Sequence, residues 1–477
     1  MTTAGEPAPV DDGRDPDGRG GLRAALSGLT TRGRSFLAAG VAAAVCAYAL
    51  GQSDLLRVGL LLAVLPLVCV AVLYRTRYRV AGSRRLSPSR VPTGEESRVH
   101  LRMDNVSRLP TGLLMLQDRV PYVLGPRPRF VLDRVEAGGQ REVSYRVRSD
   151  LRGRYPLGPL QLRLTDPFGM CELTRSFSAY DTLTVIPQVE PLPAVRLAGE
   201  ASGYGDGRNR SLALAGEDDV IPRGYRHGDD LRRVHWRSTA RYGELMVRRE
   251  EQPQRARCTV LLDTRRAAYQ GAGPDSAFEW AVSGTASALV HMLERGFSVR
   301  LLTDTGNSVP GEGAGGFAGA TQETADSAGL MMDTLAVVGH SDEAGLSRSY
   351  DMLRGGNEGL LVAFFGDLDE EQAGVAARMR QRGGAAVAFV LDRATWVRGQ
   401  GSADAGQPDG RVPAQVPVEI TARAEDRVRP LREAGWTVVT VPPGAALADL
   451  WRLAERQRAG SGASPSGGAG GTTGGWS

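Results

Sequence analysis

The chain has 477 residues, which is too long for one ordinary domain, so two or three domains are expected. Its apolar content of 42% and charged content of 23% are those of globular material. A net charge of +4 is too small to indicate nucleic-acid binding, and all 58 basic residues are Arg, which lowers the weight of any Arg-rich stretch. The four Cys have no CxxC spacing, so they indicate neither a disulfide framework nor a zinc site.

The N-terminal region combines a polar tail with two apolar runs. Residues 1–34 are rich in Gly, Asp, Pro and Arg, and we expect a disordered tail there. The charge-free runs FLAAGVAAAVCAYAL (36–50) and VGLLLAVLPLVCVAVLY (58–74) follow. Because two adjacent runs without charge are rare in soluble domains, residues 35–80 are expected to form two transmembrane helices. A pair of buried core helices is the alternative.

Basic residues on both sides of these runs predict the orientation. The turn between the runs holds one Arg and one Asp. The positive-inside rule therefore places both ends, and every later domain, in the cytoplasm of a multi-pass cell-membrane protein. The flanking basic residues are Arg23, Arg32 and Arg34 before the first run, and Arg75, Arg77, Arg79, Arg84 and Arg85 after the second.

Residues 85–190 show a period of two that is typical of half-buried strands. Apolar Val99, Leu101 and Met103 alternate with polar residues, and the same alternation occurs in 142–147 and 160–164. Gly and Pro separate these runs. The pattern predicts an all-β sandwich of antiparallel strands with a structural role.

Residues 256–456 change to short continuous apolar strands separated by helical stretches. The strands read CTVLLD, FSVRLL, LLVAFFG, AAVAFVL and WTVVTV. This alternation predicts an α/β domain with a doubly wound parallel sheet, in which ligands gather at the carboxyl ends of the strands. The Gly-rich stretch 306–319 lacks the residues of a phosphate-binding loop and is expected to be a surface loop. Residues 457–477 are expected to be disordered. The strand ends carry Asp263, Thr303, Asp304, Asp367, Asp369 and Asp392.

The segment 191–255 joins these two regions and contains IPRGYRHGDDLRRVHWRSTARYGELMVRREE at 221–251. Asp229 or Asp230 would cap a helix over 231–242, and Gly243 stands where a left-handed residue would end it. The sequence then predicts a return to an extended strand.

Three interpretations of this segment stay open. Arg side chains could pair with carboxylates while Trp236 packs, which would lock two domains together. A stripe of Arg233, Arg237 and Arg241 could bind an acidic partner or anionic headgroups. His235, oriented by Asp229 or Asp230, could act as a base in a hydrolase or transferase acting on envelope material.

The segment resembles the signature of domain-of-unknown-function family 58, and the resemblance extends over about residues 30–456. It implies a bacterial membrane-anchored protein whose C-terminal part is similar to a von Willebrand factor A domain. It also implies a MoxR-type AAA+ ATPase and a transglutaminase-like membrane protein as partners in envelope assembly or stress. The matching positions are Arg223, Tyr225, Gly228, Asp229, Asp230, Arg232, Arg233, His235, Trp236, Ala240, Arg241, Gly243, Glu244, Leu245 and Val247, with Arg237 in the same stripe.

The likeness to A domains implies a Mg²⁺ site of the form D-x-S-x-S after the first strand. Here the Asp is Asp263, but the two Ser positions hold Arg265 and Ala267. A guanidinium opposes a cation and Ala offers no oxygen, so we expect the metal site to be lost and no cofactor to bind. Asp263 would pair instead with Arg265 or Arg266. We therefore expect a scaffold or interaction protein rather than an enzyme.

Overall fold

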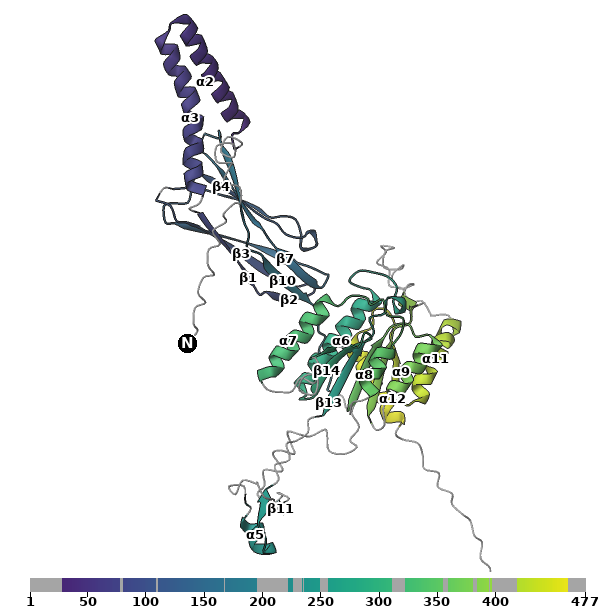
Figure 1. Cartoon of the computed structure of the whole chain (residues 1–477). Coiled ribbons are helices and arrows are strands. Elements are labelled where there is room, and N and C mark those ends of the chain that lie inside the picture. Colours follow the sequence, from purple (N-terminus) through teal and green to yellow (C-terminus); the bar gives the residue numbers. More distant parts are fainter. Residues whose placement is uncertain are drawn as a thin grey trace, which may run out of the picture. The chain divides into compact units, whose positions relative to one another are not determined.

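The computed structural model describes residues 28–77, 80–108, 110–166, 168–194, 222–225, 234, 236–248, 256–310, 322–354, 359–380, 384–393, 395–396 and 418–461. The chain divides into two compact units, Met1–Ile186 and Pro187–Ser477 (Figure 1). Most of both expected tails, residues 1–27 and 462–477, lies outside the described residues.

The first unit begins with a hairpin of two apolar helices, α2 (Thr31–Leu50) and α3 (Ser53–Arg77). Gly51 ends α2 at φ 65°, and its amide donates to the Ala47 carbonyl. The helices approach closely at Gly40, where an added Cβ would lie 2.5 Å from the Ala63 nitrogen. Both helices are long and apolar enough to cross a membrane, as the sequence predicted.

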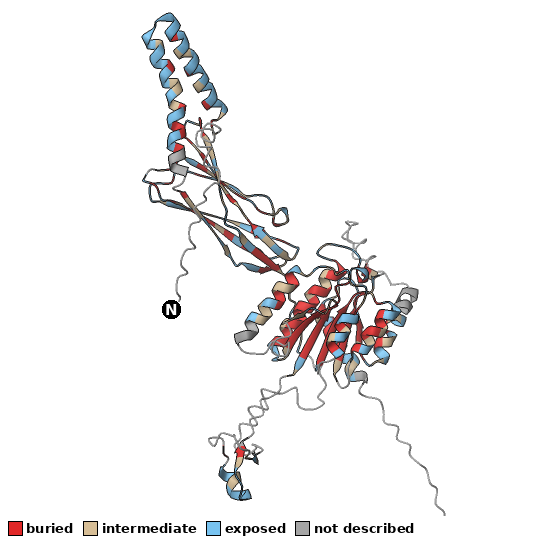
Figure 2. Ribbon diagram, in the orientation of Figure 1, coloured by how far each residue is buried: buried red, intermediate tan, exposed pale blue. Residues whose placement is uncertain are grey.

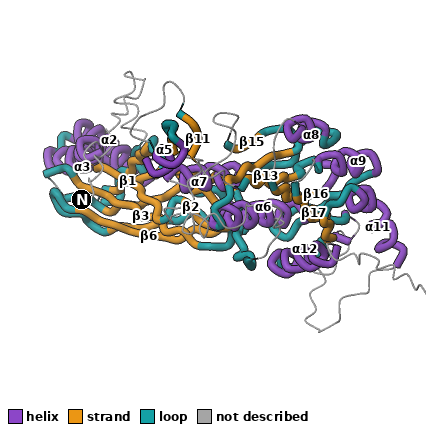
Figure 3. The backbone as a smooth tube through the Cα atoms, turned by 90° about the horizontal axis from the view of Figure 1, so that it is seen from below, coloured by secondary structure: helices purple, strands orange, loops and turns teal. Residues whose placement is uncertain are grey.

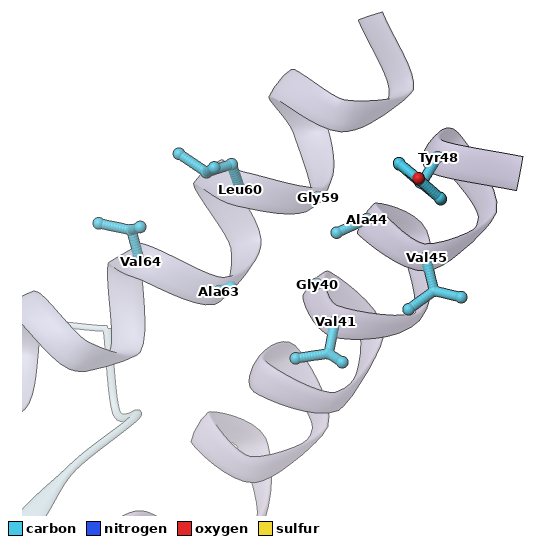
Figure 4. Close-up of a pocket in the computed structure, with 9 residues that line it drawn as sticks. All are labelled: Gly40, Val41, Ala44, Val45, Tyr48, Gly59, Leu60, Ala63 and Val64. Carbon is cyan, nitrogen blue, oxygen red and sulfur yellow. The ribbon is translucent and has the colours of Figure 1, made fainter. Parts of the chain in front are cut away.

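The apolar surface of this hairpin is solvent-exposed in the structure. A shallow groove runs between the helices, with Gly40 and Gly59 at its floor and Val45, Leu60 and Val64 along its sides (Figure 4). Close packing at small residues is the usual way in which membrane helices associate. Ordered structure also starts before the expected boundary at residue 34, because α2 begins at Thr31.

The described residues after the hairpin form ten strands and a 3-10 turn in the first unit, and the strands make three sheets, ordered β1-β3-β6, β2-β10-β7 and β5-β4-β8-β9. Their pairing is antiparallel except between β2 and β10. The elements are β1 (Val80–Ser87), β2 (Arg90–Pro92), β3 (Glu96–Asn105), β4 (Leu113–Asp118), a 3-10 turn (Tyr122–Leu124), β5 (Arg129–Leu132), β6 (Gln140–Arg148), β7 (Gly153–Leu157), β8 (Leu160–Thr165), β9 (Glu172–Phe177) and β10 (Asp181–Ile186).

The period of two correctly identified the strands of this region. Val99, Leu101 and Met103 in β3 are at most 1% exposed, as are Leu162 and Leu164 in β8. These residues belong to one apolar core that draws on all three sheets. The multiple β-sheets expected from the sequence are therefore confirmed.

The helical hairpin is joined to this core. Cys69, Val70 and Leu73 of α3 are at most 9% exposed and belong to the same apolar cluster. Leu29, just before α2, is also buried there, and its backbone forms an isolated antiparallel β-bridge with Cys171. The last turns of α3 are therefore covered by the β-sheets on one side.

A buried ion pair connects the three sheets. Arg84 of β1 donates Nε and Nη2 to the Asp118 carboxylate of β4 at 3.0 and 2.5 Å. The Tyr145 hydroxyl of β6 donates to the same carboxylate at 2.7 Å, and Arg84 Nη1 donates to the Leu157 carbonyl of β7 at 2.9 Å. Arg84, one of the basic residues that follow the second apolar run, thus has a side chain that is only 3% exposed.

The second unit contains a six-stranded mixed sheet in the order β15-β14-β13-β16-β17-β18. Five strands are parallel, and these are the apolar strands that the sequence predicted. The short antiparallel strand β15 was not expected, because its Gly-rich surroundings predicted only a loop. The strands are β13 (Arg257–Leu262), β14 (Ser298–Thr303), β15 (Ser308–Val309), β16 (Leu360–Phe365), β17 (Ala385–Val390) and β18 (Thr437–Thr440).

Helices cover both faces of this sheet (Figures 2 and 3). On one face Phe364 and Phe389 stack at 5.1 Å, and Phe389 stacks at 5.7 Å on Trp451 of α12. On the other face Leu261 and Phe365 belong to a separate apolar cluster with α8, α9 and α11. The helices described in the α/β region are α6 (Ala277–Glu294), α7 (Gln322–Val337), α8 (Ser347–Arg354), α9 (Glu370–Met379), α11 (Val418–Glu433) and α12 (Leu447–Ser461).

Candidate functional site

Acidic residues follow four of the parallel strands at one edge of the sheet. Asp263 comes directly after β13, Asp304 after β14, Asp367 after β16 and Asp392 after β17. Parallel strands end at the same edge, where the connecting loops of α/β proteins form ligand sites. The sequence correctly placed these four carboxylates, so the candidate site is built from them.

Asp263 and Arg265 form a buried bidentate ion pair at the centre of this edge. Arg265 Nε donates to Asp263 Oδ1 at 2.9 Å, and Nη2 donates to Oδ2 at 2.8 Å. The Arg265 amide donates to Oδ1 at 3.1 Å and the Gly366 amide to Oδ2 at 3.2 Å. The two side chains are 0% and 4% exposed. The carboxylate thus accepts four hydrogen bonds from the chain itself.

The electrostatics of Asp263 reflect two opposing influences. Burial raises the pKa of its carboxyl, while the hydrogen bonds and charge of Arg265 act to lower it. Burial also raises the pKa of Tyr269, whose hydroxyl donates to the Asp263 carbonyl at 2.9 Å. Tyr269 therefore stays protonated and holds the loop that follows β13.

Asp304 is paired by hydroxyl groups rather than by a cation. Its Oδ1 accepts from the amide and the hydroxyl of Thr264 at 2.7 and 2.5 Å. Its Oδ2 accepts from the Ser341 hydroxyl at 2.5 Å. The backbone of Ser341 also forms an isolated β-bridge with that of Arg265. A loop remote in sequence therefore completes the cluster. Nothing in the local sequence around Ser341 signalled this role.

The outer part of the edge carries a second ion-pair cluster. Arg427 of α11 pairs with Asp367, and its Nη1 lies 3.8 Å from Asp392 Oδ1. These residues line a small hollow with Leu368 and Thr440. Arg427 was not among the residues that the sequence singled out.

The residues expected to form a degenerate metal site are close together in the structure. Arg265 points into the Asp263 carboxylate, and Ala267 lies exposed in the one-turn 3-10 helix that follows. Arg266, the other expected partner of Asp263, pairs instead with Asp342 at the surface, with the two side chains 70% and 88% exposed. Within the described ranges, no group of three or more His, Cys, Asp or Glu is arranged to hold a metal ion.

The signature segment forms a small strand–helix–strand element, built from β11 (Pro222–Gly224), α5 (Trp236–Tyr242) and β12 (Met246–Arg248). β11 and β12 pair antiparallel, and Val234 bridges to Val247, with both Val side chains at most 7% exposed. Val234 is therefore in a β-bridge, the described helix begins at Trp236, and residues 231–233 and 235 of the expected helix lie outside the described residues. Gly243 ends it at φ 74°, as expected.

Most of the described side chains of α5 are exposed, while Ser238 and Thr239 are half-buried. Trp236 is 70% exposed and Tyr242 63% exposed, and Arg237 and Arg241 are exposed beside them. Glu244 is also exposed, while Tyr225 is half-buried and its amide donates to the Leu245 carbonyl at 2.8 Å. The other predicted signature positions outside the described residues are Gly228, Asp229, Asp230, Arg232, Arg233 and His235, together with the Arg223 side chain.

Solved structures similar to parts of this chain have low similarity scores. The CARDB domain of the PF1109 protein from Pyrococcus furiosus is 9% identical, covers 23% of this chain and 94% of that chain, and has a TM-score of 0.18. The sporulation control protein Spo0M from Bacillus subtilis is 13% identical, covers 22% and 49%, and has a TM-score of 0.15.

Sequence comparisons give a match to one relative and a match to one family model. The uncharacterized protein YeaD of Bacillus subtilis (strain 168) is 27% identical over an alignment of 272 residues, and the match covers 53% of this chain and 64% of YeaD. The match thus spans less than two thirds of that relative. The model of the family described as protein of unknown function DUF58 matches residues 222–317, which include the signature element, β13 and the Asp263–Arg265 pair.

Proposed function

We propose that this protein is a membrane-anchored scaffold that binds another protein through the surface of α5. The observation that carries the proposal is that none of the seven residues of α5 is buried, although Trp236 and Tyr242 are large and aromatic. A helix this short is not stable by itself in water and needs a packed face. Exposed Trp, Tyr and Arg together are typical of the residues that dominate protein interfaces.

We further propose that the α/β unit is a binding platform similar to a von Willebrand factor A domain. Numbered along the chain, its sheet order is 3-2-1-4-5-6, with the third strand antiparallel, and helices cover both faces. Arg265 supports a metal-independent version, because its guanidinium already neutralises Asp263 at the edge where a cation would bind. The described β-sheets of the first unit would form the sandwich that follows the membrane hairpin in the chain.

The anchor and the partner complete the proposal. α2 and α3 would cross the cell membrane, with the soluble regions in the cytoplasm, because basic residues flank both helices. The partner would be a MoxR-type AAA+ ATPase, with a transglutaminase-like membrane protein in the same envelope process. This choice of partner rests on the family resemblance.

The alternative is a hydrolase or transferase that uses His235 with Asp229 or Asp230. These three residues lie outside the described part of the chain, so the alternative stays a prediction from sequence. Loss of a hydrolytic or transfer activity in His235→Ala, with ATPase binding intact, would favour it.

Co-purification of the ATPase from membranes tests the scaffold. We expect Trp236→Ala to lower recovery of the ATPase by roughly tenfold or more, as for an interface residue worth about 2 kcal/mol. Tyr180→Ala, which removes a 60% exposed aromatic from the first unit, is the matched control and should bind normally. Unchanged recovery with Trp236→Ala would refute the proposal.

The same variants separate partner binding from a lock between domains. A surface substitution outside an intramolecular contact changes the free energy of unfolding by less than about 0.5 kcal/mol. We therefore expect Trp236→Ala to keep the melting temperature of the wild-type chain. A clear fall in melting temperature would assign Trp236 to an inter-domain lock.

A further inference from the structure

The hairpin of the first unit is in direct contact with its β-sheet region. The hydroxyl of Thr30, the residue that caps α2, donates to the Gly169 carbonyl at 2.7 Å, and the Thr30 amide donates to the Met170 carbonyl at 2.9 Å. The approach is close, since a Cβ on Gly33 would lie 2.2 Å from the Met170 oxygen. The loop between β8 and β9 is thus fixed at the level of the first turn of α2.

Buried Asp166 organises this loop. Its Oδ1 accepts from the Cys171 amide at 2.6 Å and its Oδ2 from the Phe168 amide at 3.1 Å, while its carbonyl accepts from the Gly169 amide. Asp166 is 6% exposed. Phe168, at the tip of the loop, is nevertheless 58% exposed. An ordered loop therefore presents an aromatic side chain outward.

The length of the helices places this loop at a membrane surface. The 20 residues of α2 rise by about 30 Å, which matches the thickness of a bilayer's hydrocarbon core. If the hairpin spans the membrane, the hydrocarbon ends where α2 begins. α3 agrees with this level, because Leu73 is buried in the β core while neighbouring Val72 is 52% exposed.

Further apolar residues lie at the same end of the sheets. Leu113, the first residue of β4, pairs with Thr165 at the end of β8 and is 49% exposed. Val106 directly follows β3 and is 71% exposed. Exposed Arg32 reaches the loop, where its Nη1 lies 3.8 Å from the position of a Cβ on Gly169. Aromatic and basic residues at this level are typical of a membrane interface.

We propose that this end of the β-sheets, with Phe168, Leu113, Val106 and Arg32, is a membrane-contact surface that rests on the leaflet from which the hairpin emerges. The occupant is a lipid surface because the patch is continuous with the apolar faces of α2 and α3. The inference rests on the membrane anchoring proposed above. In this arrangement the β-sheets fix the orientation of the first unit relative to the bilayer.

Fluorescence quenching by nitroxide-labelled lipids tests this in the full chain reconstituted in vesicles of phosphatidylcholine and phosphatidylglycerol. The native thiol of Cys46 is exposed on α2, whereas Cys69, Cys171 and Cys258 are buried, so a fluorophore on Cys46 reports insertion of the hairpin. In a Cys46→Ala background, Phe168→Cys reports the proposed surface. Tyr122→Cys is the matched control, since Tyr122 is 92% exposed and lies beyond the opposite end of β4.

We expect lipid nitroxides to quench the labels at positions 46 and 168 several-fold more than the label at position 122. Quenching at 46, with equal weak quenching at 168 and 122, would overturn the membrane-contact surface alone. Energy transfer between labels at 168 in place of lipid quenching would assign the surface to a second copy of the chain and would also overturn it. No quenching at 46 would overturn the anchoring and this inference together.

Discussion

Two buried Asp–Arg pairs, one in each unit, have similar local geometry but stand at different places in their folds. Arg84 and Asp118 are 34 residues apart, and the pair ties three sheets together within the first unit. Asp263 and Arg265 are two residues apart and stand at the carboxyl edge of the parallel sheet. All four side chains are at most 4% exposed.

The two pairs differ in the acceptor groups to which each Arg donates. Arg84 also donates to the carbonyls of Leu157 and Ala179, so it satisfies backbone groups between strands. Arg265 donates mainly to one carboxylate, in a place where α/β proteins bind ligands. The first pair therefore holds sheets in register, whereas the second neutralises a site. The predictions that follow test this distinction, beginning with the largest effect.

Asp118→Ala should be the most destabilising of these changes. It leaves the Arg84 guanidinium and the Tyr145 hydroxyl without their shared acceptor, and removal of one partner of a buried pair costs roughly 3–5 kcal/mol. Denaturant titration of the chain in detergent, followed by near-ultraviolet circular dichroism, measures the change. Loss of less than about 1 kcal/mol would mean that the pair does not hold the sheets together.

Arg265→Ser should destabilise the second unit by a smaller amount, about 2–4 kcal/mol, because Asp263 loses its buried counter-charge. The site should then gain a response to Mg²⁺, since Ser offers an oxygen beside the two carboxylates Asp263 and Asp304. Thermal melting with and without MgCl₂ measures both effects.

The control for Arg265→Ser is Arg266→Ser at the exposed neighbouring pair. It should change neither the melting temperature nor the response to Mg²⁺. If Arg265→Ser shows no stabilisation by Mg²⁺, the guanidinium does not stand in for a cation.

His291 is a buried titratable group whose effect on stability can be compared with that of the two ion pairs. Burial and the charge of Arg295 lower its pKa from the ordinary value of 6.5. As the pH falls below 6.5, the unfolded chain takes up this proton before the folded chain does, so stability present above that pH is lost. We expect His291→Gln to make the melting temperature less dependent on pH between neutral and mildly acidic conditions. An identical pH profile for the variant would contradict a lowered pKa.

The smallest effect is expected at an exposed pair in the first unit. Arg102 and Asp104 form an ion pair at 3.0 Å, but their side chains are 54% and 34% exposed. Arg102→Ala should change the free energy of unfolding by less than about 1 kcal/mol, since solvent screens such pairs. A loss as large as that of Asp118→Ala would show that burial does not distinguish the pairs.

The strands were predictable from sequence wherever their pattern is local. The alternation around Leu101 and the continuous apolar runs around Val260 correctly separated half-buried from fully buried strands. The start of α5 could not be predicted, because Val234 is drawn into a bridge with Val247. Strand β15 was missed since two residues leave no periodicity to detect.

The candidate site was predictable to the same extent. Asp263 and Asp304 were expected at the strand ends because an Asp follows each apolar run directly. The hydroxyl of Ser341 and the guanidinium of Arg427 were not expected, because each comes from a segment that reaches the edge only through the folded chain.

Sequence alone thus determined the contacts between residues that are near one another in the chain. The pairing of Asp263 with a nearby Arg and the glycine that ends α5 follow from neighbouring residue types, since groups close together in the chain meet at low entropic cost. Tertiary structure decided the rest. It buried Arg84 against Asp118 and the end of α3 against the β-sheets, because packing of the whole unit selects which distant groups meet.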